Sequence, residues 1–241
     1  MNQSKNDLFQ GIRNYIDFRP DAKDEYEARV ASKGLVLDIG GRNHASRSYQ
    51  RLKSLSTNPD TKIISTDVIE DYGPDIVDDI CDSRLESEGY DGVNCVAILE
   101  HVQDYEAAVG HIHRILKPGG EVFFYVPFVW GFHDTTDYHR FTFTEIDRIL
   151  QRFSQHKILL ADGNGYGGVI WLVLTFFQIA KFPRLWYWLS KASNLALAIP
   201  LTLSYLYTSV RKGRPNESLA EYIFYYSQLF LCHGLCGWAR K

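Results

Sequence analysis

The stretch VLDIGGRNH places one acid and two glycines directly after an apolar run. Asp38, Gly40 and Gly41 stand where a buried strand should end and a helix should begin. Glycine lets a backbone approach a ligand closely, and helix N–H groups and an acid can bind its polar atoms. A tight strand-to-helix turn needs glycine even without a ligand. The dinucleotide fingerprint GxGxxG is absent because Arg42 and Ala45 stand at its second and third glycine positions, which disfavours a pyrophosphate ligand.

Two further acids follow later apolar runs. Asp67, in STDV, can accept hydrogen bonds from two ribose hydroxyls, a role that suits any adenosine ligand. Asp79 stands beside Ile80 in DIVDDICD, and this pair could hold the amino edge and the face of an adenine. Each acid could instead cap a turn or face solvent. With the glycine turn, the two acids favour an adenosine-containing ligand.

The loop PFVWGFHDTTDYHRFT, residues 127–142, mixes histidines, acids and an arginine with aromatic residues after another apolar run. This composition is typical of a substrate site. Asp137 and Arg140 in the loop could also form an ion pair that only anchors it. Earlier in the chain, His101 follows Glu100, and it could either take part in catalysis or have a structural role at a helix start.

Short apolar runs alternate with helical patterns along the chain, and these elements must position the acids. Nearly unbroken apolar strands that alternate with helices predict a doubly wound α/β fold, with a parallel sheet covered on both faces. Ligands of such sheets bind outside the carboxyl ends of the strands, at the topological switch point. We expect one or two charged helices within 5–33, strands at 35–39, 61–68, 75–80, 91–99, 121–126 and 156–161, and helices at 43–55, 104–116 and 142–153.

Five segments in succession, VLDIGGRNH, STDV, DIVDDICD, YDGVNCVAILEHVQD and RILKPGGEVFFYVPF, resemble the motifs of class I S-adenosylmethionine-dependent methyltransferases of the type 11 group. The resemblance covers about 34–160 and implies a mostly parallel seven-stranded sheet with S-adenosylmethionine as cofactor. One departure is the lack of a further glycine near Arg42 or Asn43. The cofactor contacts implied are Asp38, Gly40 and Gly41 at the methionine and ribose parts, Asp67 at the ribose, Asp79 and Ile80 at the adenine, and Ala97 and Leu99 near the methyl donor.

The loop at 127–142 resembles a segment of type 11 members in cell-surface polysaccharide and glycolipid pathways, where an H…DYxRFT pattern follows the fifth strand. A hydroxyl acceptor must lose its proton during attack, and histidine has a suitable pKa, whereas a carboxylate acceptor needs no base. By this analogy His133 contacts the acceptor or the donor, and Tyr138 and Arg140 order the loop or bind the acceptor. The catalytic candidates are His133, His101 and Tyr138, and the acceptor-binding candidates are Trp130, Asp137, His139 and Arg140.

A sulfonium methyl donor needs no metal, because the enzyme contributes proximity, an in-line path and a site that excludes water. The sequence shows no His/Cys cluster at zinc-ligand spacing, and we expect no metal. The 4 cysteines lack a CxxC pair, which indicates a reducing compartment. The net charge of -3 provides no general field for nucleic acid. The polar amino terminus lacks the apolar core of a signal peptide, so we expect a cytoplasmic protein.

The composition changes in 163–229, which predicts an apolar helical insertion before a last strand within 230–241. The apolar stretches 169–180 and 195–210 are shorter than the ~20 residues that a spanning helix needs. Tryptophans with basic flanks within 169–214 are typical of an element at a membrane interface, here the inner face of the membrane. A lid over the site and a face between two copies of the chain are the alternatives.

These elements divide the chain into N-terminal helices (1–34), a cofactor-binding core (35–162), the insertion (163–229) and the last strand (230–241). We predict a methyltransferase that acts on a small-molecule or lipid-linked acceptor, at an oxygen of a saccharide or a related metabolite. The rivals are a non-catalytic membrane-bound scaffold and a nicotinamide-dependent oxidoreductase on the same architecture. The missing GxGxxG weighs against the oxidoreductase.

Overall fold

The computed structural model describes residues 14–17, 19, 21–161, 183–212, 219, 223 and 232–241. The chain divides into two compact units. The first unit comprises 1–127, 133–159 and 235–241, and the second comprises 128–132 and 160–234. The first unit contains nearly all of the sheet, and it positions every residue of the cavity described below.

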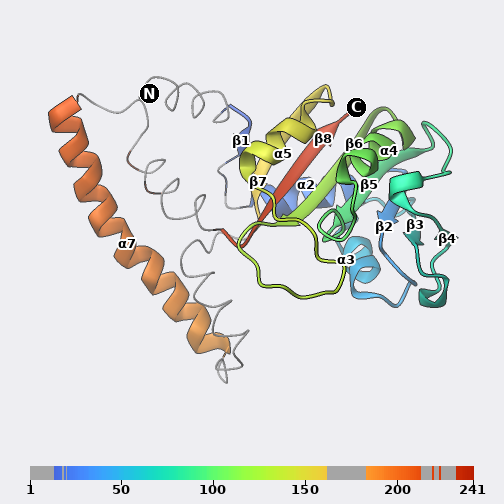
Figure 1. Ribbon diagram of the computed structural model, residues 1–241, viewed down its shortest axis with the longest axis horizontal. Helices are drawn as coiled ribbons and strands as arrows, with labels where there is room; N and C mark the ends of the chain where they lie inside the picture. The colour runs from blue at the N-terminus through green and yellow to red at the C-terminus, as the bar shows by residue number, and fades with distance from the viewer. Residues whose placement is uncertain are drawn as a thin grey trace. The chain divides into compact units, whose positions relative to one another are not determined.

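Among the described residues the sheet has eight strands, in the order β1-β7-β8-β6-β5-β2-β3-β4 (Figure 1). The pairs β1/β7, β2/β3, β2/β5, β3/β4 and β5/β6 are parallel. β8 runs antiparallel to its neighbours, as the hydrogen bonds at its end show. The Ser154 N–H, just before β7, donates to the carbonyl of Arg240, and the Lys241 N–H donates to the carbonyl of Gly120, near the start of β6. The strands are β1 (Ile16–Asp17), β2 (Leu35–Ile39), β3 (Lys62–Asp67), β4 (Ile76–Val77), β5 (Tyr90–Val96), β6 (Leu116–Pro127), β7 (Gln155–Leu160) and β8 (Gly234–Arg240).

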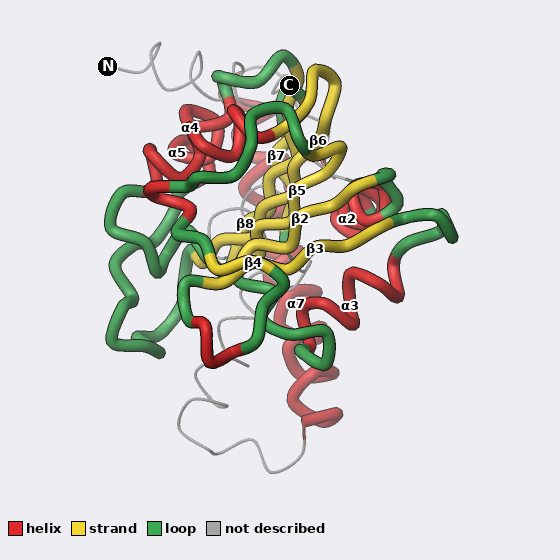
Figure 2. The backbone as a smooth tube through the Cα atoms, turned by 90° about the vertical axis from the view of Figure 1, so that its right-hand side faces the viewer, coloured by secondary structure: helices red, strands yellow, loops and turns green. Residues whose placement is uncertain are grey.

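Helices cover both faces of the sheet: α4 and α5 lie on one side, and α2 and α3 on the other (Figure 2). Three of them begin at a side-chain cap, because Ser46, Asp104 and Thr142 each accept a hydrogen bond from the backbone N–H three residues later. The helices are α2 (Ala22–Ala31), α3 (Arg47–Leu55), α4 (Tyr105–Ile115) and α5 (Phe143–Leu150), with short 3-10 helices at Glu70–Tyr72 and Ile80–Asp82.

The strand order reverses at β2, which pairs with β3 on one side and β5 on the other. In this register Asp38 lies opposite Ser65 of β3 and Asn94 of β5. The neighbouring positions Val36 and Leu37 are fully buried, as the continuous apolar pattern of a doubly covered strand requires. The switch point therefore lies at the end of β2, where the glycine turn follows.

The expected doubly wound, mostly parallel architecture is confirmed, with one strand more than the seven expected. The two-residue β1 adds this strand within a segment that we expected to be helical. β6 begins at Leu116, five residues early, because Leu116 pairs with Tyr90 of β5 across a register shift. The helix expected from residue 43 starts at Arg47, because Ser46 caps it. The strand expected at 75–80 is reduced to Ile76–Val77.

The long helix α7 (Pro183–Lys212) lies within the expected insertion and contains Pro200. Several of its apolar side chains are exposed, among them Trp188 at 69%, Leu195 at 74% and Val210 at 86%. Within the part of the chain that the structure describes, no helix is both long enough and apolar enough to cross a membrane. The apolar stretch 169–180 lies outside the described residues.

Candidate functional site

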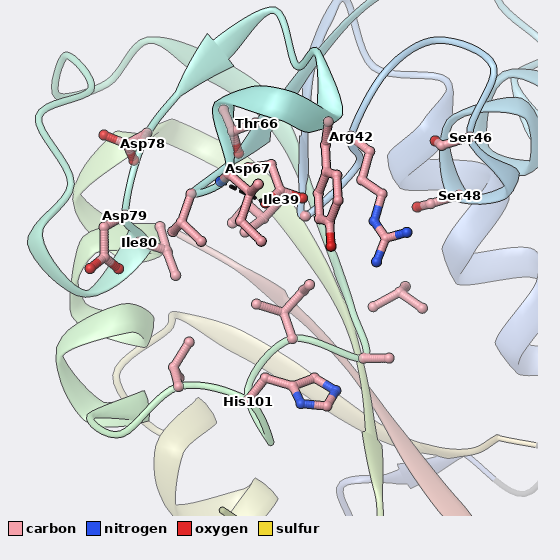
Figure 3. Close-up of a pocket in the computed structure, with 18 of the residues that line it drawn as sticks. Ile39, Arg42, Ser46, Ser48, Thr66, Asp67, Asp78, Asp79, Ile80 and His101 are labelled. Atoms are coloured by element: carbon pink, nitrogen blue, oxygen red, sulfur yellow. Dashed lines mark hydrogen bonds between the residues drawn. The ribbon is translucent and has the colours of Figure 1, made fainter. Parts of the chain in front are cut away.

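A cavity of about 710 Å³ opens at the carboxyl ends of β2, β3 and β5. Its volume lies within the roughly 300–1,000 Å³ of small-molecule sites. Figure 3 shows Arg42, Asp67, Ile80 and His101 reaching it from four different segments. The residues that line it are Ile39, Gly40, Arg42, Asn43, Ala45, Ser46, Arg47, Ser48, Thr66, Asp67, Val68, Ile69, Tyr72, Asp78, Asp79, Ile80, Val96, Ala97, Ile98, His101, Val102, Asp134 and Thr136.

The glycine turn after β2 has no room for side chains. Gly40 has a φ of +69°, and a Cβ built there would lie 2.1 Å from Cδ1 of Ile98. A Cβ at Gly41 would lie 2.5 Å from an oxygen of the Asp38 carboxylate. The Gly41 N–H donates to the carbonyl of Thr66, at 3.0 Å, which holds the turn against the end of β3. The two glycines are therefore required by close packing, and Gly40 lines the cavity.

Arg42 follows the two glycines in the left-handed conformation, with a φ of +56°. This backbone conformation favours glycine, and Arg42 is one of the two positions, with Asn43, near which the sequence lacks a further glycine. Its guanidinium carbon lies 4.3 Å from the centre of the Tyr72 ring, and this cation–π contact helps to hold the side chain over the cavity. Sequence reasoning did not predict either residue as part of the site.

Asp38 lies behind the cavity wall and is fully buried. Asn94 donates a 2.8 Å hydrogen bond to its carboxylate, and the Ser48 hydroxyl lies 3.1 Å away. Burial raises the pKa of Asp38 to about 6, while these hydrogen bonds act in the opposite direction. Leu99 is also fully buried and outside the lining. Both residues support the wall, and neither presents its side chain to the cavity.

The predicted ribose and adenine residues line the cavity together. Asp67 ends β3, and one of its carboxylate oxygens accepts a 3.0 Å hydrogen bond from the Ile69 N–H. The Asp79 carboxylate caps the following 3-10 helix by accepting from the Cys81 N–H at 2.9 Å. Ile80 is buried and contributes an apolar wall. The structure therefore brings Asp67, Asp79 and Ile80 to one cavity, although Asp79 also has the turn-capping role that was its alternative.

The segment after β5 carries the residues at the other end of the cavity. Ala97 lines it in the left-handed conformation, with a φ of +56°. Glu100 is 1% exposed, and burial raises its pKa to about 7. His101 lines the cavity, and its Nδ1 lies 3.1 Å from the carbonyl oxygen of Thr136. The loop after β6 is thereby attached to the segment that follows β5.

His133 lies next to His101, with their ring centres 5.0 Å apart in an edge-on arrangement. The Nδ1 atom of His133 is 3.1 Å from a carboxylate oxygen of Asp137, whose side chain is 1% exposed. Arg140 donates to the same carboxylate at 2.6 Å, and the pair holds the pKa of Asp137 well below its usual range. The ion pair that was the alternative for Asp137 and Arg140 is therefore present, and it also positions His133.

The remaining loop candidates have structural contacts. The N–H groups of Tyr138 and His139 both donate to the backbone carbonyl of Glu100, at 2.8 and 3.3 Å. Tyr138 remains 48% exposed, and a His139 ring nitrogen lies 3.3 Å from the carbonyl of Gln103. Trp130 belongs to the second unit, where its ring lies near that of His233, with their centres 5.8 Å apart.

Asn94 is a second residue that sequence reasoning missed. A polar side chain in the middle of the apolar run YDGVNCVAIL was the available signal. In a strand buried on both faces, such a side chain needs a polar partner. The partner is Asp38, 56 positions earlier in the chain.

A reversed strand order at β2, a glycine turn at the switch point and an acid at the end of β3 are features of doubly wound folds that bind an adenosine-containing ligand, and the class I methyltransferases share this architecture. Comparison with known proteins agrees with this class, because a family model described as a methyltransferase domain matches residues 15–161, more than half of the chain. The chain belongs to this family, whose cofactor is S-adenosylmethionine. The cavity has both an acid, Asp67, and an apolar side chain, Ile80, among the residues that line it.

Curated relatives match shorter parts of the chain. A ubiquinone biosynthesis O-methyltransferase of Xanthomonas oryzae pv. oryzae is 34% identical over 112 residues, which are 42% of this chain and 46% of that protein. The enzyme of the same name from Pseudomonas syringae pv. tomato is 49% identical over 37 residues, 15% of this chain and 16% of that protein. The chain therefore spans less than half the length of these relatives.

Solved structures with a similar fold have low sequence identity. A SAM-dependent methyltransferase from Archaeoglobus fulgidus superposes with a TM-score of 0.51 and 14% identity, covering 91% of this chain and 95% of that one. The [4+2]-cyclase SpnF superposes with a TM-score of 0.50 and 14% identity, covering 93% and 85%. At this identity the two structures show the fold alone, and the fold is compatible with more than one reaction.

The Asp67→Ala variant should bind S-adenosylmethionine about 1–3 kcal/mol more weakly, because charge-assisted hydrogen bonds to the ribose hydroxyls are lost. Isothermal titration calorimetry measures this change. Asp71→Ala removes an exposed acid four residues away that does not line the cavity, and it is the matched control. Equal affinity in the Asp67 variant and the control would remove Asp67 from the ribose role.

The buried Asp38 carboxyl should make stability depend on pH. A carboxyl whose pKa is raised by folding stabilises the folded protein most below its unfolded pKa, and this contribution is lost as the pH rises through the folded value of about 6. Relative to Asp38→Asn, the wild-type protein should lose about 1 to 2 kcal/mol of unfolding free energy between about pH 5 and about pH 7.5.

Urea denaturation of both proteins at several pH values measures this difference. Asp60→Asn, at an exposed turn, is the control and should follow the wild type. Parallel pH curves for the wild type and Asp38→Asn would show that the carboxyl titrates alike in the folded and unfolded chains.

Proposed function

We propose that this protein transfers a methyl group from S-adenosylmethionine to an oxygen of a small-molecule or lipid-linked acceptor, such as a hydroxyl of a saccharide or a related metabolite. The observation that carries this proposal is the pair of histidines at the cavity, since His101 lines it and His133 lies against His101. A hydroxyl must lose its proton as it attacks, and an imidazole near the attack site can accept it. The name O-methyltransferase of the curated relatives also supports an oxygen acceptor.

In this proposal one set of residues binds the cofactor and another binds the acceptor. Asp67, Asp79, Ile80 and Gly40 would hold the nucleoside and amino-acid parts of the cofactor, and Ala97 would lie at the methyl end. When bound, the cofactor supplies an electrophilic methyl group on a sulfonium. This distribution leaves the histidine end of the cavity for the acceptor.

Positioning of His133 depends on Asp137. The buried carboxylate contacts the Nδ1 atom of His133 and is itself held by Arg140. A hydrogen bond from Nδ1 to a carboxylate orients an imidazole and fixes its tautomer, which leaves the other ring nitrogen as the proton acceptor. Tyr138, which is half exposed, is proposed to order the loop or contact the acceptor.

Trp130, His139 and Arg140 are proposed to bind the methyl acceptor. Residues 169–214 are proposed to make peripheral contact with the inner face of the membrane, and exposed Trp188 and Val210 support this proposal. A lipid-linked acceptor would lie in the same membrane. A lid and a contact between two copies of the chain are alternative roles for the segment.

Calorimetric titration with S-adenosylmethionine, S-adenosylhomocysteine and NAD tests the cofactor. Binding of the two adenosyl sulfur compounds without NAD is expected, because Asp67 can accept from ribose hydroxyls while no pyrophosphate turn is present. Binding of NAD alone would favour an oxidoreductase. Binding of the sulfur compounds without turnover on any glycan or lipid-linked hydroxyl would favour a scaffold.

For the His133→Ala variant we expect loss of methyl transfer with the affinity for S-adenosylmethionine intact, because His133 is not among the residues that line the cavity. Transfer is measured by the release of S-adenosylhomocysteine. His111→Ala, on α4, is the control and should retain both properties. A fully active His133→Ala variant would exclude this residue from catalysis.

A further inference from the structure

We propose that Glu100, His101 and His133 form a binding site for a divalent transition-metal ion beside the cofactor cavity. One carboxylate oxygen and one nitrogen from each ring all lie within 4.8 Å of one another. The three residues come from two segments, the one that follows β5 and the loop after β6. All three belong to the first unit of the chain.

The spacing of the donor atoms is close to that of a bound ion. Zinc binds imidazole nitrogen at about 2.0–2.1 Å and carboxylate oxygen at about 2.0–2.2 Å, so two ligand atoms on one ion lie roughly 3 to 4 Å apart. The Nε2 atom of His101 is 3.9 Å from a carboxylate oxygen of Glu100. His133 is one-third exposed and lies on a loop, so its ring can close the remaining distance with a side-chain adjustment.

The contacts of the Nδ1 atoms of His101 and His133 also match those of metal-binding histidines. Such residues usually donate their other ring N–H to a carboxylate or a backbone carbonyl, which fixes the tautomer and the ring orientation. The Nδ1 atom of His101 lies 3.1 Å from the Thr136 carbonyl oxygen, and the Nδ1 atom of His133 lies 3.1 Å from Asp137. Both rings are therefore held through Nδ1, an arrangement that assigns metal binding to Nε2.

An independent observation is the buried carboxylate of Glu100. Its side chain is 2% exposed, and within the described part of the chain its Oε2 atom has no hydrogen-bond partner. A buried carboxyl group either keeps its proton or, when it is ionised, needs a cation or hydrogen-bond donors to offset its charge. A metal ion between Glu100 and the two histidines would provide that compensation.

The donor set selects the kind of ion. Two imidazoles and one carboxylate are the protein ligands of several catalytic zinc sites, where the fourth position is left for water or substrate. Calcium and magnesium prefer oxygen ligands throughout, so this mixed set favours zinc, cobalt, iron or manganese. The site is therefore of the open type that binds a substrate atom directly.

The role of the ion in catalysis rests on the proposed function, whereas its binding does not. An acceptor hydroxyl bound at the open position would have a lowered pKa and would release its proton to solvent. The oxygen would then form its bond to the methyl carbon as the carbon–sulfur bond of the cofactor breaks. With the ion bound, both histidines are its ligands, and proton release to solvent replaces the proton transfer to an imidazole that the metal-free site would use.

Direct metal binding tests the site. The full chain is stripped with a chelator, dialysed and titrated with Co²⁺, whose visible absorption reports its ligands, and with Zn²⁺ by calorimetry. One ion per chain is expected. Loss of an outer-shell partner weakens metal sites by about 10–100-fold, so His133→Ala, which removes a ligand, should weaken binding by more than about tenfold. Glu100→Gln should do the same, and His111→Ala should bind like the wild type.

A folding control separates loss of the site from loss of the fold. His133 lies on an exposed loop, so its variant should keep wild-type affinity for S-adenosylmethionine even if Glu100→Gln does not fold. Absence of Co²⁺ and Zn²⁺ binding, or binding unchanged in His133→Ala, would overturn the metal site. Methyl transfer that persists in chelator without bound metal would also overturn its catalytic role and would leave the proposed function standing. Metal binding without methyl transfer would uphold the site alone.

Discussion

The hydrogen bond between Asn94 and Asp38, buried where the strand order reverses, is the constraint on which the rest of the site depends. A buried carboxylate needs polar partners, and Asp38 finds them on β5 and, through Ser48, on α3. A slip of one residue between β2 and β5 would break this contact and leave the buried Asp38 carboxylate without its partner on β5. The bond therefore sets the position of Gly40 relative to Ala97.

Glu100 has a second organising role, because it connects the segment after β5 with the loop after β6. Its backbone carbonyl accepts from the N–H groups of Tyr138 and His139, which attaches the loop to the segment after β5. Its side chain is buried beneath His101 and His133. The loop after β6 docks on the backbone carbonyl of Glu100, and this brings the Glu100 carboxylate together with the imidazoles of His101 and His133. Neither the loop nor the segment after β5 contains all three groups.

Two residues of the cavity have backbone conformations that are unusual for their types. Arg42 and Ala97 both have a φ of +56°, which costs about 1 to 3 kcal/mol each for residues other than glycine. Such conformations persist only where the surroundings determine them, and they concentrate at binding sites. The Tyr72 ring against Arg42 and the Tyr125 carbonyl, which accepts from the Ala97 N–H at 3.0 Å, are parts of those surroundings. The fold supplies the switch point, and these local conformations shape the site.

The sequence by itself determined the alternation of strands and helices, the glycine turn and the acids at the strand ends, because periodicity and turn residues act over a few positions. Asp67 and Ile80 lie at the cavity as those local patterns predict. Only the tertiary structure decided that Asn94 would meet Asp38 and that His133 would lie against His101. Such contacts join residues far apart in the chain, and they follow from strand order and loop docking, which short patterns do not encode.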